Sequence, residues 1–153
     1  MWYNRREGGI IVIKQFIKKP RVYLDTSVIS HLHQLDARQE WQDTTKRFWK
    51  EIEKGNYIAC ISDIVLDEIG KANQEKVDIM LSYLNSIDYE QVEEADDVVS
   101  LSEEYINQGI VPVKYRDDAR HIAIATINNC DIIASWNFKH MVKYSTIIQV
   151  NRS

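Results

Sequence analysis

The sequence predicts an α/β fold: a three-layer domain around a central parallel sheet of about five strands. Short apolar segments alternate along the chain with amphipathic helical segments, which is typical of parallel strands joined by right-handed crossover helices. The first, second and fourth apolar segments have the composition of strands buried on both faces. The 153 residues, 44% hydrophobic and 27% charged, suit one globular domain.

Five segments are predicted to be strands because β-branched and apolar residues dominate them. They span residues 22–24, 57–61, 87–89, 131–134 and 146–150. Helical periodicity is found in the intervals, at residues 44–53, 64–69, 77–84, 98–106 and 119–127. Gly55 and Asn56 are expected to end the first of these helices.

The N-terminal arm, residues 1–20, differs in charge from the domain predicted at residues 21–153. Residues 1–21 hold six basic side chains and one acidic, so they contribute +5 to a net charge of −4, and the remainder carries −9. We hypothesise that translation starts at Val12 and that residues 1–11 are a mis-annotated extension. If the arm is genuine, its charge suggests contact with nucleic acid or a partner.

The composition also indicates in which cellular compartment the protein is expected and which class of protein is excluded. A pI of about 5.6 excludes a protein that coats nucleic acid through overall positive charge. Cys60 and Cys130 lie in or beside apolar runs and are expected to be buried thiols in a reducing compartment. Residues 10–13 are too short for a signal-peptide core, and no segment has the length of a transmembrane helix, so a cytoplasmic location with no membrane contact is expected.

The first candidate functional residue is Asp25, which directly follows the predicted strand 22–24. Thr26 and Ser27 can begin a helix, so Asp25 is expected where the carboxyl end of a strand meets a helix start. Open α/β sheets bind ligands at this edge. An Asx turn or a helix cap explains a single aspartate equally well, so a functional interpretation requires other polar residues at the same edge.

Glu68 is the second candidate. Ser62 follows the second strand and is a natural N-cap, so the helix 64–69 leaves the same edge and carries Glu68 near its second turn. Neighbouring acids have simpler explanations: Asp63 interacts with the helix dipole, and Asp67 lies about 100° around the helix, as a surface residue.

The third candidate is Asp118, which with Asp117 opens the predicted helix 119–127. Small alanines let this helix pack closely and bring its first turn toward the strand ends, so Asp118 is expected to point toward Asp25. The helix dipole also explains paired aspartates, and Asp117 stays an alternative to Asp118. His121, one turn later, is interpreted as a core or supporting group and not as a ligand.

Asn137 is the fourth candidate because it follows the predicted strand 131–134 and Ser135. It places an amide at the same edge, although a turn or a helix cap would explain it in isolation. Asp131 precedes the strand and belongs at the opposite edge. Four polar residues at one edge together indicate a site.

These motifs form an ordered set. The chain contains Tyr-Leu-Asp-Thr-Ser at 23–27, Glu-Ile at 68–69, Asp-Ala-Arg-His-Ile-Ala at 118–123 and Ser-Trp-Asn-Phe-Lys-His at 135–140. From about residue 21 to the C-terminus the set resembles the PIN domain, named for the N-terminal domain of PilT. The resemblance implies a Rossmann-like fold and a metal-dependent ribonuclease site. Many small prokaryotic members of that family are the toxins of VapBC toxin–antitoxin pairs.

Carried over residue by residue, the resemblance implies that Asp25, Glu68 and Asp118 hold a divalent metal ion, Mg²⁺ or Mn²⁺. Asn137 completes the expected catalytic set. It stands where many family members have a fourth acid, and this departure weakens a second metal position more than the first. These are hard ions that prefer carboxylate and water oxygens, and clustered carboxylates raise one another's pKa values unless a cation binds.

The expected reaction is hydrolysis of RNA phosphodiester bonds to give 5′-phosphate and 3′-hydroxyl ends, as the resemblance implies. A bound divalent ion orients the scissile phosphate, lowers the pKa of the attacking water and offsets charge on the leaving oxygen. The hydroxyl of Thr26 or Ser27 matches a family position and is expected to hold a metal-bound water.

The expected partners are an RNA substrate, a cognate antitoxin protein and a second copy in a homodimer. The alternative is a PIN-fold module that has lost catalysis and binds RNA or protein, motivated by Asn137. A metal phosphatase or DNA nuclease that uses the same acids is a remoter alternative.

An acidic domain needs a local basic rim to meet RNA. Lys114, Arg116, Lys139, His140 and Lys143 lie near the proposed edge in sequence, although a solvated surface explains them equally.

Aromatic and histidine residues near the second predicted helix have ordinary explanations. Trp41, Phe48 and Trp49 are interpreted as packing a helix or forming a partner groove, and not as a base-stacking platform. His31 and His33 have the spacing of a metal pair but no partner ligands, so they are interpreted as surface or rim residues.

Overall fold

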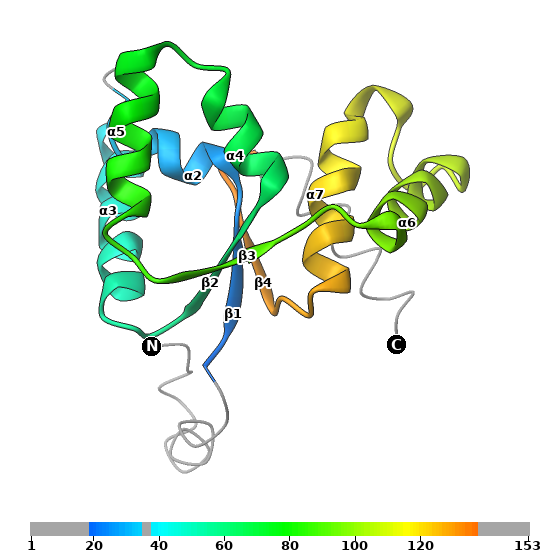
Figure 1. The fold of residues 1–153 in the computed structure, drawn as a ribbon, viewed down its shortest axis with the longest axis horizontal. Helices are drawn as coiled ribbons and strands as arrows, with labels where there is room; N and C mark the ends of the chain where they lie inside the picture. The colour runs from blue at the N-terminus through cyan, green and yellow to red at the C-terminus, as the bar shows by residue number, and fades with distance from the viewer. Residues whose placement is uncertain (1–18, 35–37, 138–153) are drawn as a thin grey trace.

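The computed structural model describes residues 19–34 and 38–137 (Figure 1). Its sheet contains β1 (Arg21–Leu24), β2 (Ile58–Ser62), β3 (Tyr89–Val92) and β4 (Ile132–Ala134). The four strands are parallel in the order β3-β2-β1-β4, which confirms the predicted α/β class. The predicted fifth strand, 146–150, and most of the arm lie outside the described residues.

The register of the sheet brings three strand ends to one edge. Tyr23 of β1 pairs with Cys60 of β2 on one side and with Ile133 of β4 on the other. All three strands run in the same direction, so the residues that follow them, Asp25 among them, lie side by side. The predicted meeting of strand ends at one edge is therefore confirmed.

The third strand differs from its prediction. Residues 87–89 were expected to be the strand, but β3 begins at Tyr89. Ile87 is 8% exposed and belongs to the core, whereas Tyr89 is 37% exposed at the edge of the sheet. The apolar signal therefore marks the turn that packs before the strand, because an edge strand with one solvated face carries polar residues.

Six α-helices connect and follow these strands within the described ranges. They are α2 (Thr26–His31), α3 (Gln39–Glu53), α4 (Asp63–Gly70), α5 (Gln74–Leu84), α6 (Asp96–Asn107) and α7 (Arg116–Ile127), with a short 3-10 helix η2 (Val113–Tyr115) before α7. Ser62 caps α4, as predicted, because its Oγ accepts the Val65 N–H at 3.1 Å. Gly55 adopts φ +82° and its N–H donates to the Ile52 carbonyl at 2.9 Å, which ends α3 as predicted.

The helices form layers on both sides of the sheet. Figure 1 shows α3 and α5 on one side and α6 and α7 on the other. All of Val22, Tyr23 and Leu24 of β1 are fully buried, as expected for a central strand. Ala119 and Ala123 of α7 are also fully buried, so small side chains bring this helix close to its neighbours.

The sequence predicted buried thiols and no membrane-spanning segment. Cys60 is buried, Cys130 is half-buried, and both are free thiols. Among the described helices, none is both long enough and apolar enough to cross a membrane.

Candidate metal centre

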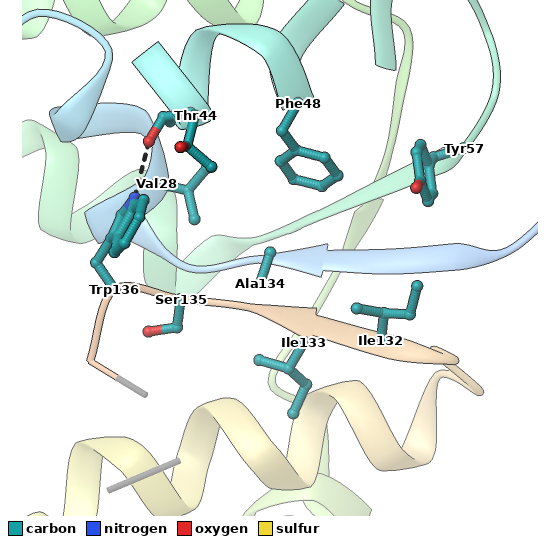
Figure 2. Close-up of a pocket in the computed structure, with 10 residues that line it drawn as sticks. Val28, Thr44, Phe48, Tyr57, Ile132, Ile133, Ala134, Ser135 and Trp136 are labelled. Carbon is teal, nitrogen blue, oxygen red and sulfur yellow. Dashed lines mark hydrogen bonds between the residues drawn. The ribbon is translucent and has the colours of Figure 1, made fainter. Parts of the chain in front are cut away.

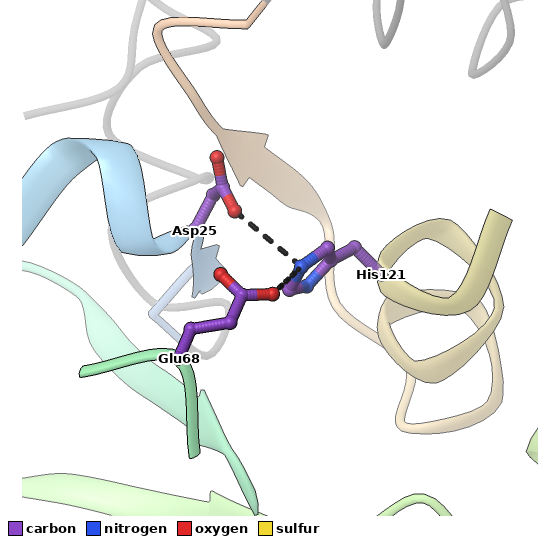
Figure 3. A group of neighbouring side chains, drawn as sticks. All are labelled: Asp25, Glu68 and His121. Carbon is purple, nitrogen blue, oxygen red and sulfur yellow. Dashed lines mark hydrogen bonds and ion pairs between the residues drawn. The ribbon is translucent and has the colours of Figure 1, made fainter. Parts of the chain in front are cut away.

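Three side chains from separate elements converge at the carboxyl edge of the sheet (Figure 3). Asp25 follows β1, Glu68 projects from α4 and His121 projects from α7. One possible ligand atom from each residue lies within 4.8 Å of the other two. The structure therefore brings together two of the predicted acids and adds a histidine.

Asp25 is held by hydroxyl groups from two directions. It is 3% exposed, and its Oδ2 accepts hydrogen bonds from Ser27 and Ser135, each at 2.8 Å. It stands at the N-cap of α2 but makes no side-chain cap bond. Helix capping by the carboxylate, the simpler explanation of this aspartate, is therefore wrong.

Glu68 is half-buried and uses both carboxylate oxygens. Its Oε1 lies 3.0 Å from His121 Nε2, and its Oε2 accepts a hydrogen bond from Thr26 Oγ1 at 2.5 Å. Burial raises the pKa of Glu68, but the bonds from His121 and Thr26 and the charges of His121 and Arg120 outweigh it, so the pKa is lowered. Glu68 is therefore held as a carboxylate.

His121 is the residue whose role the sequence understated. Its 3% exposure confirms the interpretation as a core group, but its contacts with both acids were missed. Burial lowers the pKa of His121, but the hydrogen bond to Glu68 and the charges of Asp25, Glu68 and Asp118 raise it by more, so the net shift is upward. The upward shift favours the protonated imidazole, whose positive charge would offset part of the acidic charge.

Tyr23 supports His121 from inside β1, and sequence reasoning missed it. Its hydroxyl lies 2.5 Å from His121 Nδ1 and 2.8 Å from Ser62 Oγ, which is itself fully buried. Burial raises the pKa of Tyr23, so the phenol stays protonated. A tyrosine two residues before Asp25, in a strand predicted to be buried on both faces, is the signal that could have indicated this role, because a buried hydroxyl needs a partner.

Asp118 lies in the first turn of α7, half-buried, and its charge contributes to raising the pKa of His121. It is outside the group of three ligand atoms described above. Asp117 is 77% exposed on its side chain and pairs with Arg120 at 3.2 Å, so it turns away from the site. The assignment of Asp118 as a metal ligand stays a prediction.

Asn137 is exposed at the end of the described chain. Its N–H donates to Ser135 Oγ at 3.0 Å, and the same hydroxyl donates to Asp25. Asn137 is thus connected to Asp25 through the hydroxyl group of Ser135. Its catalytic role also stays a prediction.

Other acids have the structural roles expected of them. Asp63 accepts the N–H groups of Ile64 and Glu94 at 2.9 and 3.1 Å. Asp67 is exposed on α4. Asp131 accepts the Arg21 N–H at 2.8 Å at the opposite end of the sheet, as predicted.

The proposed basic rim receives little support from the part of the chain that the structure describes. Arg116 pairs with Glu103, and Lys114 lies 5.0 Å from the centroid of the Tyr115 ring. Lys139, His140 and Lys143 lie outside the described residues.

The donor set fits a divalent cation. The Oδ1 atom of the buried Asp25 accepts no hydrogen bond from the described residues, and His121 Nε2 lies 3.6 Å from it. A buried carboxylate oxygen without a hydrogen-bond donor costs free energy, and binding a cation would offset this cost. Carboxylate oxygens suit Mg²⁺ and Mn²⁺, and a neutral imidazole nitrogen suits the softer transition metals, so His121 would favour Mn²⁺ over Mg²⁺ only after losing a proton to the incoming ion.

Comparison with known proteins bears on the fold. No protein-family model matches the chain, and no curated protein matches it. It is similar to a chain in the crystal structure of VapBC2 from Rickettsia felis bound to a DNA fragment from their promoter, with a TM-score of 0.56 and 17% sequence identity over 80% of this chain and 94% of that chain. At this identity the likeness concerns the fold alone, and it supports the PIN-like fold that the sequence motifs predict.

Proposed function

We propose that this protein is a divalent-metal-dependent endoribonuclease that hydrolyses RNA phosphodiester bonds, and that it is the toxin of a type II toxin–antitoxin pair. The observation that carries the proposal is the convergence of Asp25 and Glu68 at the carboxyl edge of the sheet, with Asp118 in the adjoining first turn of α7. Asp25 is buried and Glu68 and Asp118 are half-buried, and carboxylates held this close together are costly without a cation.

The chemistry follows from the residues. Asp25, Glu68 and Asp118 would hold Mg²⁺ or Mn²⁺, which when bound supplies an activated water and charge for the leaving oxygen. Ser27 and Ser135 fix the orientation of the Asp25 carboxylate, and Thr26 fixes that of Glu68. His121 holds both acids together by hydrogen bonding and charge, and Asn137 extends the same edge toward the substrate.

The toxin role rests on the fold. A structure similar to this chain is that of VapBC2, which is bound to a promoter DNA fragment. We extend this to a cognate antitoxin for the present chain, encoded by a neighbouring small gene, and to homodimerisation. Growth arrest on expression, relieved by co-expression of the neighbouring gene, is the expected result, and unimpaired growth would contradict the toxin role.

A second candidate is a PIN-fold module that binds RNA or protein without cleaving. The observation that favours it is Asn137, an amide where a fourth acid would assist catalysis. Retained binding without cleavage under any divalent metal would support this candidate.

The deciding experiment compares RNA, DNA and a phosphomonoester as substrates with Mg²⁺, Mn²⁺ or chelator. We expect metal-dependent cleavage of RNA, abolished by Asp25→Asn and by Glu68→Gln. Asp67→Asn is the matched control, because it removes an exposed carboxylate one residue from Glu68 on the same helix. Cleavage that survives Asp25→Asn would refute the site.

A further inference from the structure

Three aromatic side chains, His31, Trp41 and Trp136, form what we call the aromatic cluster. The rings of Trp41 and Trp136 stack with 4.8 Å between centroids and 10° between planes. His31 stacks on Trp136 at 5.4 Å and 21°. All three residues are half-buried, so the cluster presents nearly parallel rings close to the surface.

The cluster differs from the aromatic packing of the core. Phe48 meets Tyr57 at 73°, and Trp49 meets Tyr83 at 84°, both edge to face. Trp49 is 2% exposed, and its indole N–H donates to Ser86 Oγ at 3.0 Å. Within the aromatic cluster, Trp136 packs against the hydrophobic core, whereas Trp41 is not among the described residues that do so. Helix packing therefore accounts for Trp49 but not for Trp41.

Ser27 links the aromatic cluster to the metal centre. Its Oγ donates to Asp25 and accepts the backbone N–H of Trp136 at 2.9 Å. Its carbonyl oxygen accepts a hydrogen bond from His31 Nδ1 at 2.7 Å. The residue that orients the first acid therefore also holds the His31 ring and the backbone of Trp136.

A pocket opens beside the Trp136 ring (Figure 2). It has a volume of about 340 Å³, and its walls include Trp136, Ser135, Phe48 and Tyr57. The Trp136 indole N–H donates to Thr45 Oγ1 at 2.9 Å, which fixes the ring at the pocket wall. Ser135 lines the pocket and also hydrogen-bonds Asp25, so this space adjoins the metal centre.

Arg38 adds a positive charge to the aromatic cluster. It is exposed, and its guanidinium carbon lies 5.2 Å from the centroid of the Trp41 ring. A cation–π contact at an exposed site is weaker than stacking of a base on an aromatic ring, so a base can replace the guanidinium at the ring. Arg38 is then available to a phosphate of the same strand.

We propose that the aromatic cluster stacks a nucleobase of single-stranded RNA, next to the phosphate that lies at the metal centre. This inference rests on the proposed function for its choice of RNA. Aromatic rings on which bases stack, together with positive side chains that meet the phosphates, are the features by which proteins bind single strands without reading their sequence.

The test measures affinity for a short labelled oligouridylate by fluorescence anisotropy in chelator, where no cleavage occurs. The second probe is the same strand with abasic residues, which keeps the phosphates and removes the bases. The proteins are the wild type, Trp41→Ala, Trp41→Phe and Leu81→Ala, the last an exposed apolar control on α5 that is 40% exposed. Circular dichroism verifies that each variant is folded.

We expect Trp41→Ala to weaken binding of the complete strand about 5- to 100-fold and to leave binding of the abasic strand unchanged. Trp41→Phe, which keeps a ring for stacking, should retain most of the affinity, and Leu81→Ala should match the wild type. Equal binding of both strands by the wild type and by Trp41→Ala overturns the proposal and leaves the cluster to a protein partner. Base-dependent binding with no cleavage in any metal refutes the ribonuclease function and keeps the stacking site.

Discussion

The Nε2 atom of His121 lies 3.0 Å from the Oε1 atom of Glu68, and both residues come from helices that begin at the carboxyl edge of the sheet. This pair places among the acids an imidazole whose raised pKa favours its cationic form. It explains how two carboxylates can share a buried site before any metal binds.

Replacing His121 tests this explanation. We expect His121→Ala to lower the free energy of unfolding in chelator by about 3 kcal/mol, because Glu68, Asp25 and the Tyr23 hydroxyl each lose a partner. Urea denaturation measures the change, with Asp67→Asn as an exposed-acid control expected to have no effect. Addition of Mn²⁺ should restore part of the loss. A His121→Ala variant as stable as the wild type would show that the acids do not depend on this imidazole.

Ser135 is expected to tune metal affinity through Asp25. Ser135→Ala removes one of two hydroxyl donors to Asp25 Oδ2 and so loosens the orientation of the carboxylate. Loss of such a supporting hydrogen bond weakens metal binding by about 10-fold or more. Titration with Mn²⁺, followed by calorimetry, measures the affinity. Ser82→Ala, which removes an exposed hydroxyl on α5, is the control, and equal affinities for all three proteins would contradict the role of Ser135.

The choice between Asp118 and Asp117 is open to a direct comparison. We expect Asp118→Asn to weaken Mn²⁺ binding about 10-fold or more by removing a ligand or a charge that acts on His121. Asp117→Asn should change it little, because that carboxylate is exposed and pairs with Arg120. The same calorimetric titration separates the two variants. A larger effect from Asp117→Asn would reverse the assignment.

His33 should make stability depend on pH. Burial, followed by the charge of Lys76, lowers its pKa, and both ring nitrogens are buried without a hydrogen-bond partner among the described residues. A lowered pKa in the folded state means that the unfolded chain binds the proton first. The contribution of His33 to the free energy of unfolding is therefore complete above its unfolded pKa of about 6.5. That contribution is lost as the pH falls through the pKa of His33 in the folded state.

His33→Phe separates this effect from the other histidines. The phenyl ring keeps the stack on Tyr83, whose centroid lies 6.3 Å from that of His33, and cannot titrate. Urea denaturation midpoints across pH 5 to 8 should show the wild type losing stability relative to the variant as the pH falls. Parallel pH profiles for the two proteins would contradict a lowered pKa of His33 in the folded protein.

Much of the fold was predictable because secondary structure follows local patterns. The buried run Val22–Leu24 and the N-cap Ser62 are both short-range signals, and both were found as predicted. The third strand was misplaced because the apolar signal at Ile87 reports burial, and a core residue in a turn gives the same signal as one in a strand.

The sequence by itself determined that Asp25 follows a central parallel strand and that Glu68 leaves the same edge on a capped helix. Only the tertiary structure decided that His121 lies between these acids, that Tyr23 supports it, and that Trp136 stacks on Trp41. These contacts join residues far apart in the chain, and they depend on strand register and on the rotation of each helix about its axis. Periodicity fixes which face of an element is buried, but not which side chain of another element it meets.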